Sequence, residues 1–128
     1  MQLFALMLAL AWGHGEDKLG PNQGFVKMPG GFHTELVKTD EQHIKVYLLD
    51  LEFKNPSTKD SKVEVRLNKK GKWTSCPAKE NFFACDLKAA LGKGGISDPG
   101  TLQVQATREK QKGNVADYAL PLTLHGNM

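Results

Sequence analysis

The chain has 128 residues, with 17 Lys and Arg against 14 Asp and Glu, and a formal net charge of +3. This length allows one domain with a modest core and excludes a TIM barrel or a complete dinucleotide-binding enzyme. A hydrophobic content of 40% is too high for a disordered chain, and so small a net charge gives no reason to expect nucleic-acid binding.

The chain opens with an apolar run from Leu3 to Trp12, LFALMLALAW. The run is too short for a membrane-spanning helix, which needs about 20 residues, so we expect no stable membrane anchor. Its length suits the apolar part of a secretory signal, and small residues follow it. We therefore predict a cleaved signal peptide over residues 1–13, export to the periplasm or the medium, and a mature start at His14. Cleavage after Ala11 and a buried N-terminal helix are the alternatives.

Residues 14–24 are polar and rich in Gly and Pro, which predicts a flexible mature N-terminus. A single domain is then expected over residues 25–124, followed by a tail over residues 125–128. Alternating side chains at 32–38 and β-branched and aromatic residues at 44–51 predict the first two strands of this domain.

These two strands should form a hairpin around a turn at residues 39–41. The register that keeps apolar residues on one face places Leu36 opposite Ile44. It also places Glu35 opposite Lys45 on the outer, solvent-exposed face, where their charges attract each other.

Further strands are predicted at residues 61–67, 72–76, 82–85, 101–108 and 115–124. Asp86 can cap a short helix over 87–91 that Gly92 stops, and Pro121 places the last strand at an edge or a bend. The fold expected is all-β: an immunoglobulin-like antiparallel β-sandwich of seven or eight strands with one short helical turn, or else a small barrel.

Cys76 and Cys85 are the only cysteines, and eight residues separate them. That spacing is not the CxxC of a redox enzyme or a zinc knuckle. If the two lie on paired arms of a hairpin, their Cα atoms are about 4.5–5.5 Å apart, close enough for a disulfide. A structural disulfide is therefore expected, in agreement with export.

Transition-metal binding is the sharpest chemical hypothesis. A mature N-terminal His14 would offer its α-amine and its imidazole as a chelating pair for Cu(II) or another transition metal. His33 and Glu35 point to one face of a strand and can share a site with a third ligand, and the Met28 thioether suits Cu(I). The alternatives are a solvated His14, an exposed His33 beside an ion pair, and a half-buried Met28.

The segments HGEDKLGPNQG, MPGGFHTELV and VYLLD, within residues 14–50, resemble small exported bacterial domains with a GPHGG…HxELV…VYLLD pattern. Such domains occur alone or near periplasmic adaptor subunits of heavy-metal efflux systems. The resemblance implies a periplasmic β-rich domain that handles copper or another heavy metal, with His33 and Glu35 at the positions of the strand histidine and its acidic neighbour. One departure is that Asn22 and Gln23 replace the His-Gly of the pattern.

The sequence shows no nucleophile elbow or other catalytic motif, so we predict a non-enzymatic exported binding domain. Its predicted role is periplasmic copper or heavy-metal handling, with efflux components as partners. The alternative is a metal-independent structural or protein-interaction module. A copper oxidase with an N-terminal histidine is a remote third hypothesis, since the chain looks too small.

Overall fold

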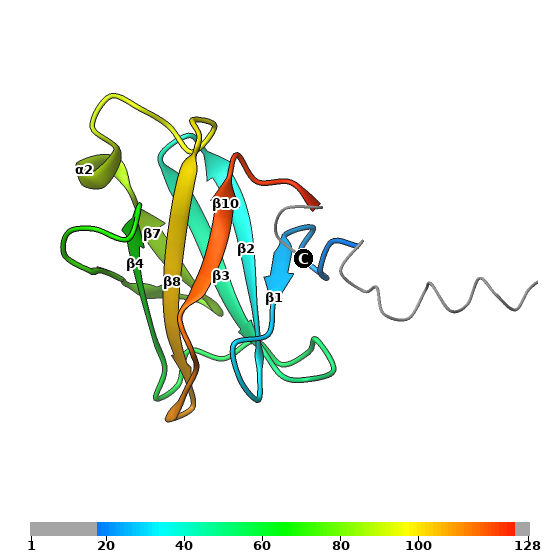
Figure 1. Cartoon of the computed structure of the whole chain (residues 1–128). Helices are drawn as coiled ribbons and strands as arrows, with labels where there is room; N and C mark the ends of the chain where they lie inside the picture. The colour runs from blue at the N-terminus through cyan, green and yellow to red at the C-terminus, as the bar shows by residue number, and fades with distance from the viewer. Residues whose placement is uncertain (1–17, 125–128) are drawn as a thin grey trace, which may run out of the picture.

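The computed structural model describes residues 18–124, which form two antiparallel sheets and a short helix (Figure 1). Sheet A has the strand order β1 (Phe25–Lys27), β2 (His33–Asp40), β3 (His43–Leu49), β7 (Phe82–Asp86) and β6 (Ala78–Lys79). Sheet B has the order β10 (Ala116–Leu120), β8 (Gly100–Arg108), β4 (Lys62–Leu67) and β5 (Thr74–Cys76), and β9 (Gln111–Lys112) pairs with β8. Helix α2 (Lys88–Leu91) follows β7.

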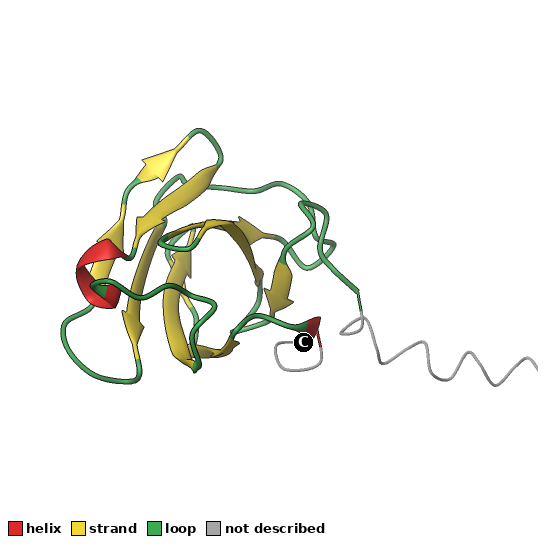
Figure 2. Ribbon diagram, turned by 90° about the horizontal axis from the view of Figure 1, so that it is seen from above, coloured by secondary structure: helices red, strands yellow, loops and turns green. Residues whose placement is uncertain are grey.

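The two sheets face each other around one core, as the view from above shows (Figure 2). This arrangement confirms the predicted antiparallel β-sandwich and not the small barrel. None of the helical segments within residues 18–124 has the length and apolarity needed to cross a bilayer.

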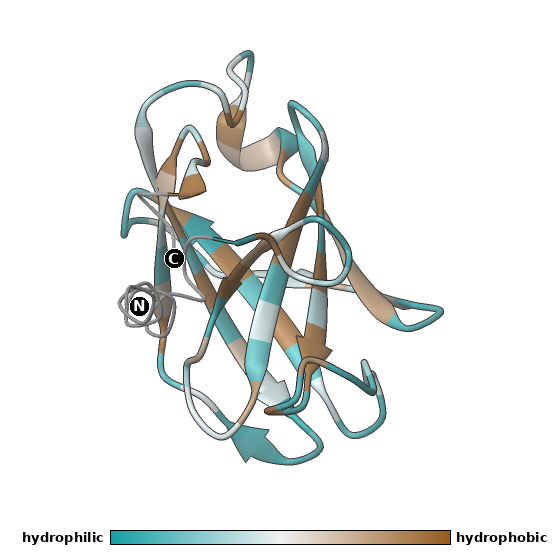
Figure 3. Ribbon diagram, turned by 90° about the vertical axis from the view of Figure 1, so that its right-hand side faces the viewer, coloured by the Kyte–Doolittle hydropathy of each residue, from teal (hydrophilic) through white to brown (hydrophobic). Residues whose placement is uncertain are grey.

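Side-chain alternation along the strands builds the core, and apolar and polar bands follow one another in Figure 3. In β4, for example, Val63 and Val65 are about 1% exposed whereas Lys62 is exposed. Residues from both sheets interdigitate in this core. Its largest fully buried apolar side chains are Tyr118, Phe32, Leu36, Ile44, Leu48, Leu49, Leu87, Ile96 and Leu102.

The register of the β2–β3 hairpin differs from the predicted one by two residues. Leu36 pairs with Val46 and not with Ile44, and Glu35 pairs with Tyr47 and not with Lys45. Strand β2 continues to Asp40, and a bulge between Lys38 and Asp40 lets the chain return at His43. A shift of two keeps every side chain on its predicted face, because side chains alternate with a period of two.

Seven of the strands match predicted ones, and β1, β6 and β9 were missed because each has only two or three residues. Strand β10 lies at the edge of sheet B, as predicted, but it ends at Leu120, immediately before Pro121, and does not continue to residue 124. The predicted short helix is present over Lys88–Leu91 and ends at Gly92, which has φ 59°. Its N-cap is Leu87 and not Asp86, whose carboxylate still accepts a hydrogen bond of 2.9 Å from Lys88 N.

The predicted disulfide joins Cys76 to Cys85, with 4.6 Å between the Cα atoms. Cys76 ends β5, where it pairs with Val63 of sheet B, and Cys85 lies in β7, where it pairs with Ile44 of sheet A. The chain passes between the sheets at Pro77, which separates β5 from β6. The disulfide therefore ties the two sheets together at this corner, a role that the hairpin model did not include.

Candidate functional site

Glu35, predicted on an exposed face, is 0% exposed. Its side-chain oxygens accept hydrogen bonds from Asn22 N (2.7 Å), Asn22 Nδ2 (2.9 Å) and Gly24 N (2.8 Å). The predicted exposure of Glu35 was wrong because a segment 11 to 13 residues upstream covers the outer face of β2. Both oxygens are thus engaged in holding that segment.

The covering segment, residues 20–24, forms a tight turn and not the flexible arm predicted for this part of the chain. Gly20 N donates to Gly24 O at 2.8 Å, and Gln23 has φ 64°. A Cβ on Gly24 would lie 2.6 Å from Leu36 O, and one on Gly20 would lie 2.7 Å from the Glu35 carboxyl carbon. Only glycine allows this backbone to approach the strand so closely.

His33 lies two residues before Glu35 on β2 but has contacts of its own. Its Nδ1 is 3.1 Å from Asp50 O, and its ring stacks on Phe53 with 3.9 Å between the ring centroids. A carbonyl oxygen only accepts, so Nδ1 donates to it. His33 is 9% exposed, with Phe53 stacked on its ring.

The other predicted ligands are not gathered around His33. Met28 follows β1 and is 62% exposed, and not half-buried. His14 lies outside the described residues. Among residues 18–124, no group of three or more His, Cys, Asp and Glu side chains has an arrangement suited to a metal ion. His33 and Glu35 are therefore neighbours on one strand with separate structural contacts.

The structure brings a different histidine close to two carboxylates. His43 Nδ1 is 2.8 Å from Asp40 Oδ1, and His43 Nε2 is 3.6 Å from Asp86 Oδ1. The hydrogen bond to Asp40 raises the pKa of His43, and the charges of Asp40 and Asp86 add to this. No sequence pattern points to Asp86 as a neighbour of His43, because Asp86 lies 43 residues later and meets His43 only through the pairing of β3 with β7.

Asp50 shapes the loop after β3. Its carboxylate accepts hydrogen bonds from the backbone N–H groups of Glu52 and Lys54 and from Asn55 Nδ2, at 2.7–2.9 Å. These bonds, led by that from Lys54, lower the pKa of Asp50. The loop they fix places Phe53 over His33.

Exposed apolar side chains gather around this loop. Phe53 is 40% exposed and Leu51 50%, and Leu19 (40%) lines a hollow of about 170 Å³ together with Phe53, Pro21 and Val26. The remaining large exposed hydrophobic side chains of the described chain belong to adjoining loops. We call the whole set the apolar end: Leu19, Met28, Leu51, Phe53 and Val115.

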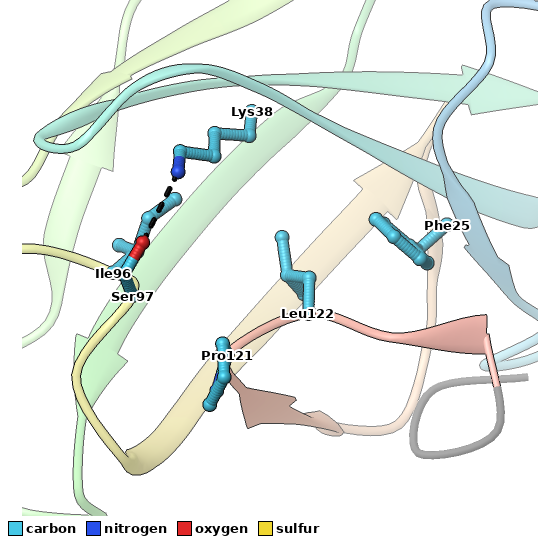
Figure 4. A pocket seen from close by; sticks show the side chains of 6 residues that line it. All are labelled: Phe25, Lys38, Ile96, Ser97, Pro121 and Leu122. Carbon is cyan, nitrogen blue, oxygen red and sulfur yellow. Dashed lines mark hydrogen bonds between the residues drawn. The ribbon is translucent and has the colours of Figure 1, made fainter.

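A second hollow, of about 320 Å³, opens near β1 and the segment that follows β10 (Figure 4). Phe25 and Leu122 line it and also pack against the core. Lys38 and Ser97 border it and are joined by a hydrogen bond of 3.3 Å. None of the predicted site residues lines this groove, so it is separate from the His33 region.

No protein-family model matches the chain, and neither a curated protein nor a solved structure matches it significantly.

Proposed function

We propose that this chain is an exported, non-enzymatic binding domain that docks on another protein through the apolar end. The observation that carries the proposal is that four of the five large hydrophobic side chains exposed within residues 18–124 come from loops at one end of the sandwich (Figure 1), and the fifth, Leu19, shares a hollow with Phe53. Clustered exposed apolar groups are costly to keep in water and typically mark interaction surfaces.

Ring stacking and hydrogen bonds connect the loops of the apolar end. The stacking of Phe53 on His33 joins the β3–β4 loop to the start of β2. Asn114 N donates to Pro29 O at 2.9 Å, which joins the loop that carries Val115 to the loop that carries Met28. Arg108 Nη2 donates to Asn55 O at 2.6 Å on the same end. These contacts limit loop motion, so little conformational entropy is lost on docking.

Export is supported by two independent features. The apolar run at the start of the chain is suited to a secretory signal, and the Cys76–Cys85 disulfide is of a kind that persists in oxidising compartments. The resemblance to domains found near efflux adaptors makes a periplasmic adaptor subunit the first partner to test.

The test is site-specific photo-crosslinking in the cell envelope. A photoreactive residue at position 51 should capture one defined partner, whereas the same residue at position 88, on exposed α2, should not. The purified partner should then bind the domain, and Leu51→Ser with Met28→Ser should weaken binding by about tenfold or more. Equal capture at positions 51 and 88, or no effect of the double substitution, would reject docking through this end.

Metal handling is a second candidate, favoured by the orientation of His33. A histidine that donates Nδ1–H to a backbone carbonyl, as His33 does to Asp50 O, has the arrangement common among metal ligands. His14 is four residues from Lys18, a separation that a chain spans by at most about 14 Å, and Lys18 lines the same hollow as Phe53.

A titration with Cu(II) tests this candidate. We expect a Kd below about 1 μM for the chain that begins at His14, and His14→Ala should weaken binding by at least about tenfold. His33→Gln should weaken it further if His33 supplies a ligand. A Cu(II) affinity that His14→Ala does not change would reject metal handling, and protein docking would be the only remaining candidate.

A further inference from the structure

A continuous row of side chains crosses the outer face of sheet B, perpendicular to its strands. Arg66 of β4 pairs with Gln103 of β8, and Gln103 pairs with Asp117 of β10. Arg66 Nε donates to Gln103 Oε1 at 2.7 Å, and Gln103 Nε2 donates to Asp117 Oδ1 at 3.0 Å. At the other end of the row, the guanidinium of Arg66 lies over the ring of Trp73, 4.5 Å from its centroid. We call these four residues the sheet B row.

The sheet B row is held in place before any ligand arrives. Each side chain of the row is hydrogen-bonded to or stacked on the next. Gln103 is only 8% exposed although its side chain projects from the outer face of the sheet. Within the row, Arg66 uses one of the five N–H donors of its guanidinium, and the amide and carboxylate have further hydrogen-bonding capacity. A ligand along the row would therefore meet ordered donors, acceptors and an aromatic ring, and would lose little side-chain entropy.

A cationic turn lies at one end of this face. The β4–β5 turn carries Lys69, Lys70 and Lys72 within seven residues of Arg66. Lys69 Nζ is 3.6 Å from Asp117 Oδ2, which links the turn to the row. Lys70 and Lys72 are exposed and have no ion pair with any residue in the described part of the chain. Lys70 and Lys72 thus present positive charge that no ion pair within residues 18–124 neutralises.

We propose that the sheet B row and the β4–β5 turn form a binding site for a short anionic oligosaccharide. The row crosses β10, β8 and β4 and ends at Trp73, immediately before β5; at spacings of about 4.8 Å its length is about 14 Å, suited to a linear oligomer. The face of the Trp73 ring opposite Arg66 can pack against the C–H face of a sugar, and the exposed Asp117 carboxylate can hydrogen-bond its hydroxyl groups. The lysines and Arg66 complement carboxylate or sulfate groups.

An anionic membrane fits this surface less well. An anionic bilayer is flat and wider than the row, so it would press its headgroups against the carboxylates of Asp117 and Glu64 on this face. A short oligomer can instead place its charged groups at Arg66 and the lysines and its hydroxyl groups at Asp117. The site is also remote from the apolar end: the turn lies beside the start of β8, whereas the apolar end adjoins the other end of β8, where Arg108 contacts Asn55. Oligosaccharide and protein partner can therefore bind at the same time.

Tryptophan fluorescence of the full chain provides a direct test. The sequence has two tryptophans, and Trp12 lies in the predicted signal peptide, so Trp73 is the only reporter in the chain that begins at His14. In the uncleaved chain, Trp12→Phe serves the same purpose. Oligogalacturonate should shift this emission and bind with a Kd in the micromolar to millimolar range, about 10-fold or more tighter than a neutral malto-oligosaccharide of equal length, at physiological ionic strength. Equal affinity for the two saccharides, or no binding of oligogalacturonate, would overturn the proposal.

Matched variants locate the site. Lys70→Gln with Lys72→Gln should weaken oligogalacturonate binding by about tenfold, and Arg66→Gln by a similar factor. The control, Lys110→Gln with Lys112→Gln, removes the same charge at the β8–β9 turn and should change affinity less than about twofold. Equal losses in both double variants would show non-specific attraction and overturn the site. Binding to anionic phospholipid vesicles with the same variant dependence would assign the surface to a membrane and also overturn it.

Discussion

Two histidines of sheet A have carboxylates near them in the sequence, and the structure treats them in opposite ways. His33 and Glu35 lie under cover: Glu35 is fully buried by residues 20–24, and Phe53 stacks on His33. His43 lies in the open between Asp40 and Asp86, with about half of its side chain exposed. The sequence pattern predicted a metal site at His33 and Glu35, whereas in the structure it is His43 that lies closer to carboxylates.

The difference shows that alternation along a strand assigns a face and not a degree of exposure. Glu35 points away from the core, as predicted, but a distant segment supplies three N–H donors to it. A buried carboxylate with three such donors is a structural anchor, because it satisfies both itself and the backbone of the turn. His43 has no covering segment, so its ion pairs are exposed to solvent and weak.

Among substitutions that test this difference, the largest loss of stability is expected at Glu35. Glu35→Ala should lower the free energy of unfolding by about 3 kcal/mol, because it removes the acceptor from three N–H groups and leaves space behind. Urea denaturation measures this change. Glu35→Gln serves as the isosteric control. Its free energy of unfolding should lie between those of the original protein and the alanine variant, since the glutamine side chain keeps one acceptor oxygen. An alanine variant as stable as the original would show that the covering turn is not anchored there.

The fit of the turn can be tested at its glycines. Gly24→Ala should cost about 2 kcal/mol, because its Cβ would approach the backbone oxygen of Leu36 to 2.6 Å. Gly30→Ala is the matched control, since its nearest neighbour would be at the ordinary distance of 3.6 Å. Thermal or urea unfolding of the two variants should therefore differ clearly. If both are equally stable, residues 20–24 do not lie as close to β2 as described.

A smaller effect is expected from uncovering His33. Phe53→Ala removes the stacked ring and should cost about 1 kcal/mol. The same change should make the His33 ring more accessible to diethyl pyrocarbonate, which modifies exposed imidazoles. Phe53→Leu, which keeps apolar cover without an aromatic ring, separates shielding from stacking. Unchanged modification of His33 in the alanine variant would mean that another group covers the ring.

The smallest effect is the pH dependence at His43. Its pKa is raised by Asp40, so the ion pairs stabilise the fold fully below the usual histidine pKa near 6.5 and lose this contribution as pH rises through the higher folded-state value. The melting temperature of His43→Gln should therefore fall below that of the original protein at pH 5.5, and the gap should narrow by pH 8.5. An NMR titration of the His43 ring should give a pKa above 6.5. A gap that widens with pH would contradict the assigned pairing.

Local chemistry along the chain determined most of the scaffold. Alternating apolar residues located seven strands, Asp86 and Gly92 located the short helix, and the spacing of Cys76 and Cys85 predicted the disulfide. These features depend on neighbours in the sequence or on a period of two, both of which can be read from a single chain.

The tertiary structure decided the register of the strands, the exposure of their side chains and the partners that those side chains contact. The bulge before Asp40 set the register of β2 and β3, the segment around Asn22 turned Glu35 from an exposed ligand candidate into a buried anchor, and β7 brought Asp86 to His43. Each outcome depends on residues far apart in the sequence that meet only after the sheets form. Faces follow from the covalent geometry of a strand, whereas cover and partners depend on which other segments lie against it.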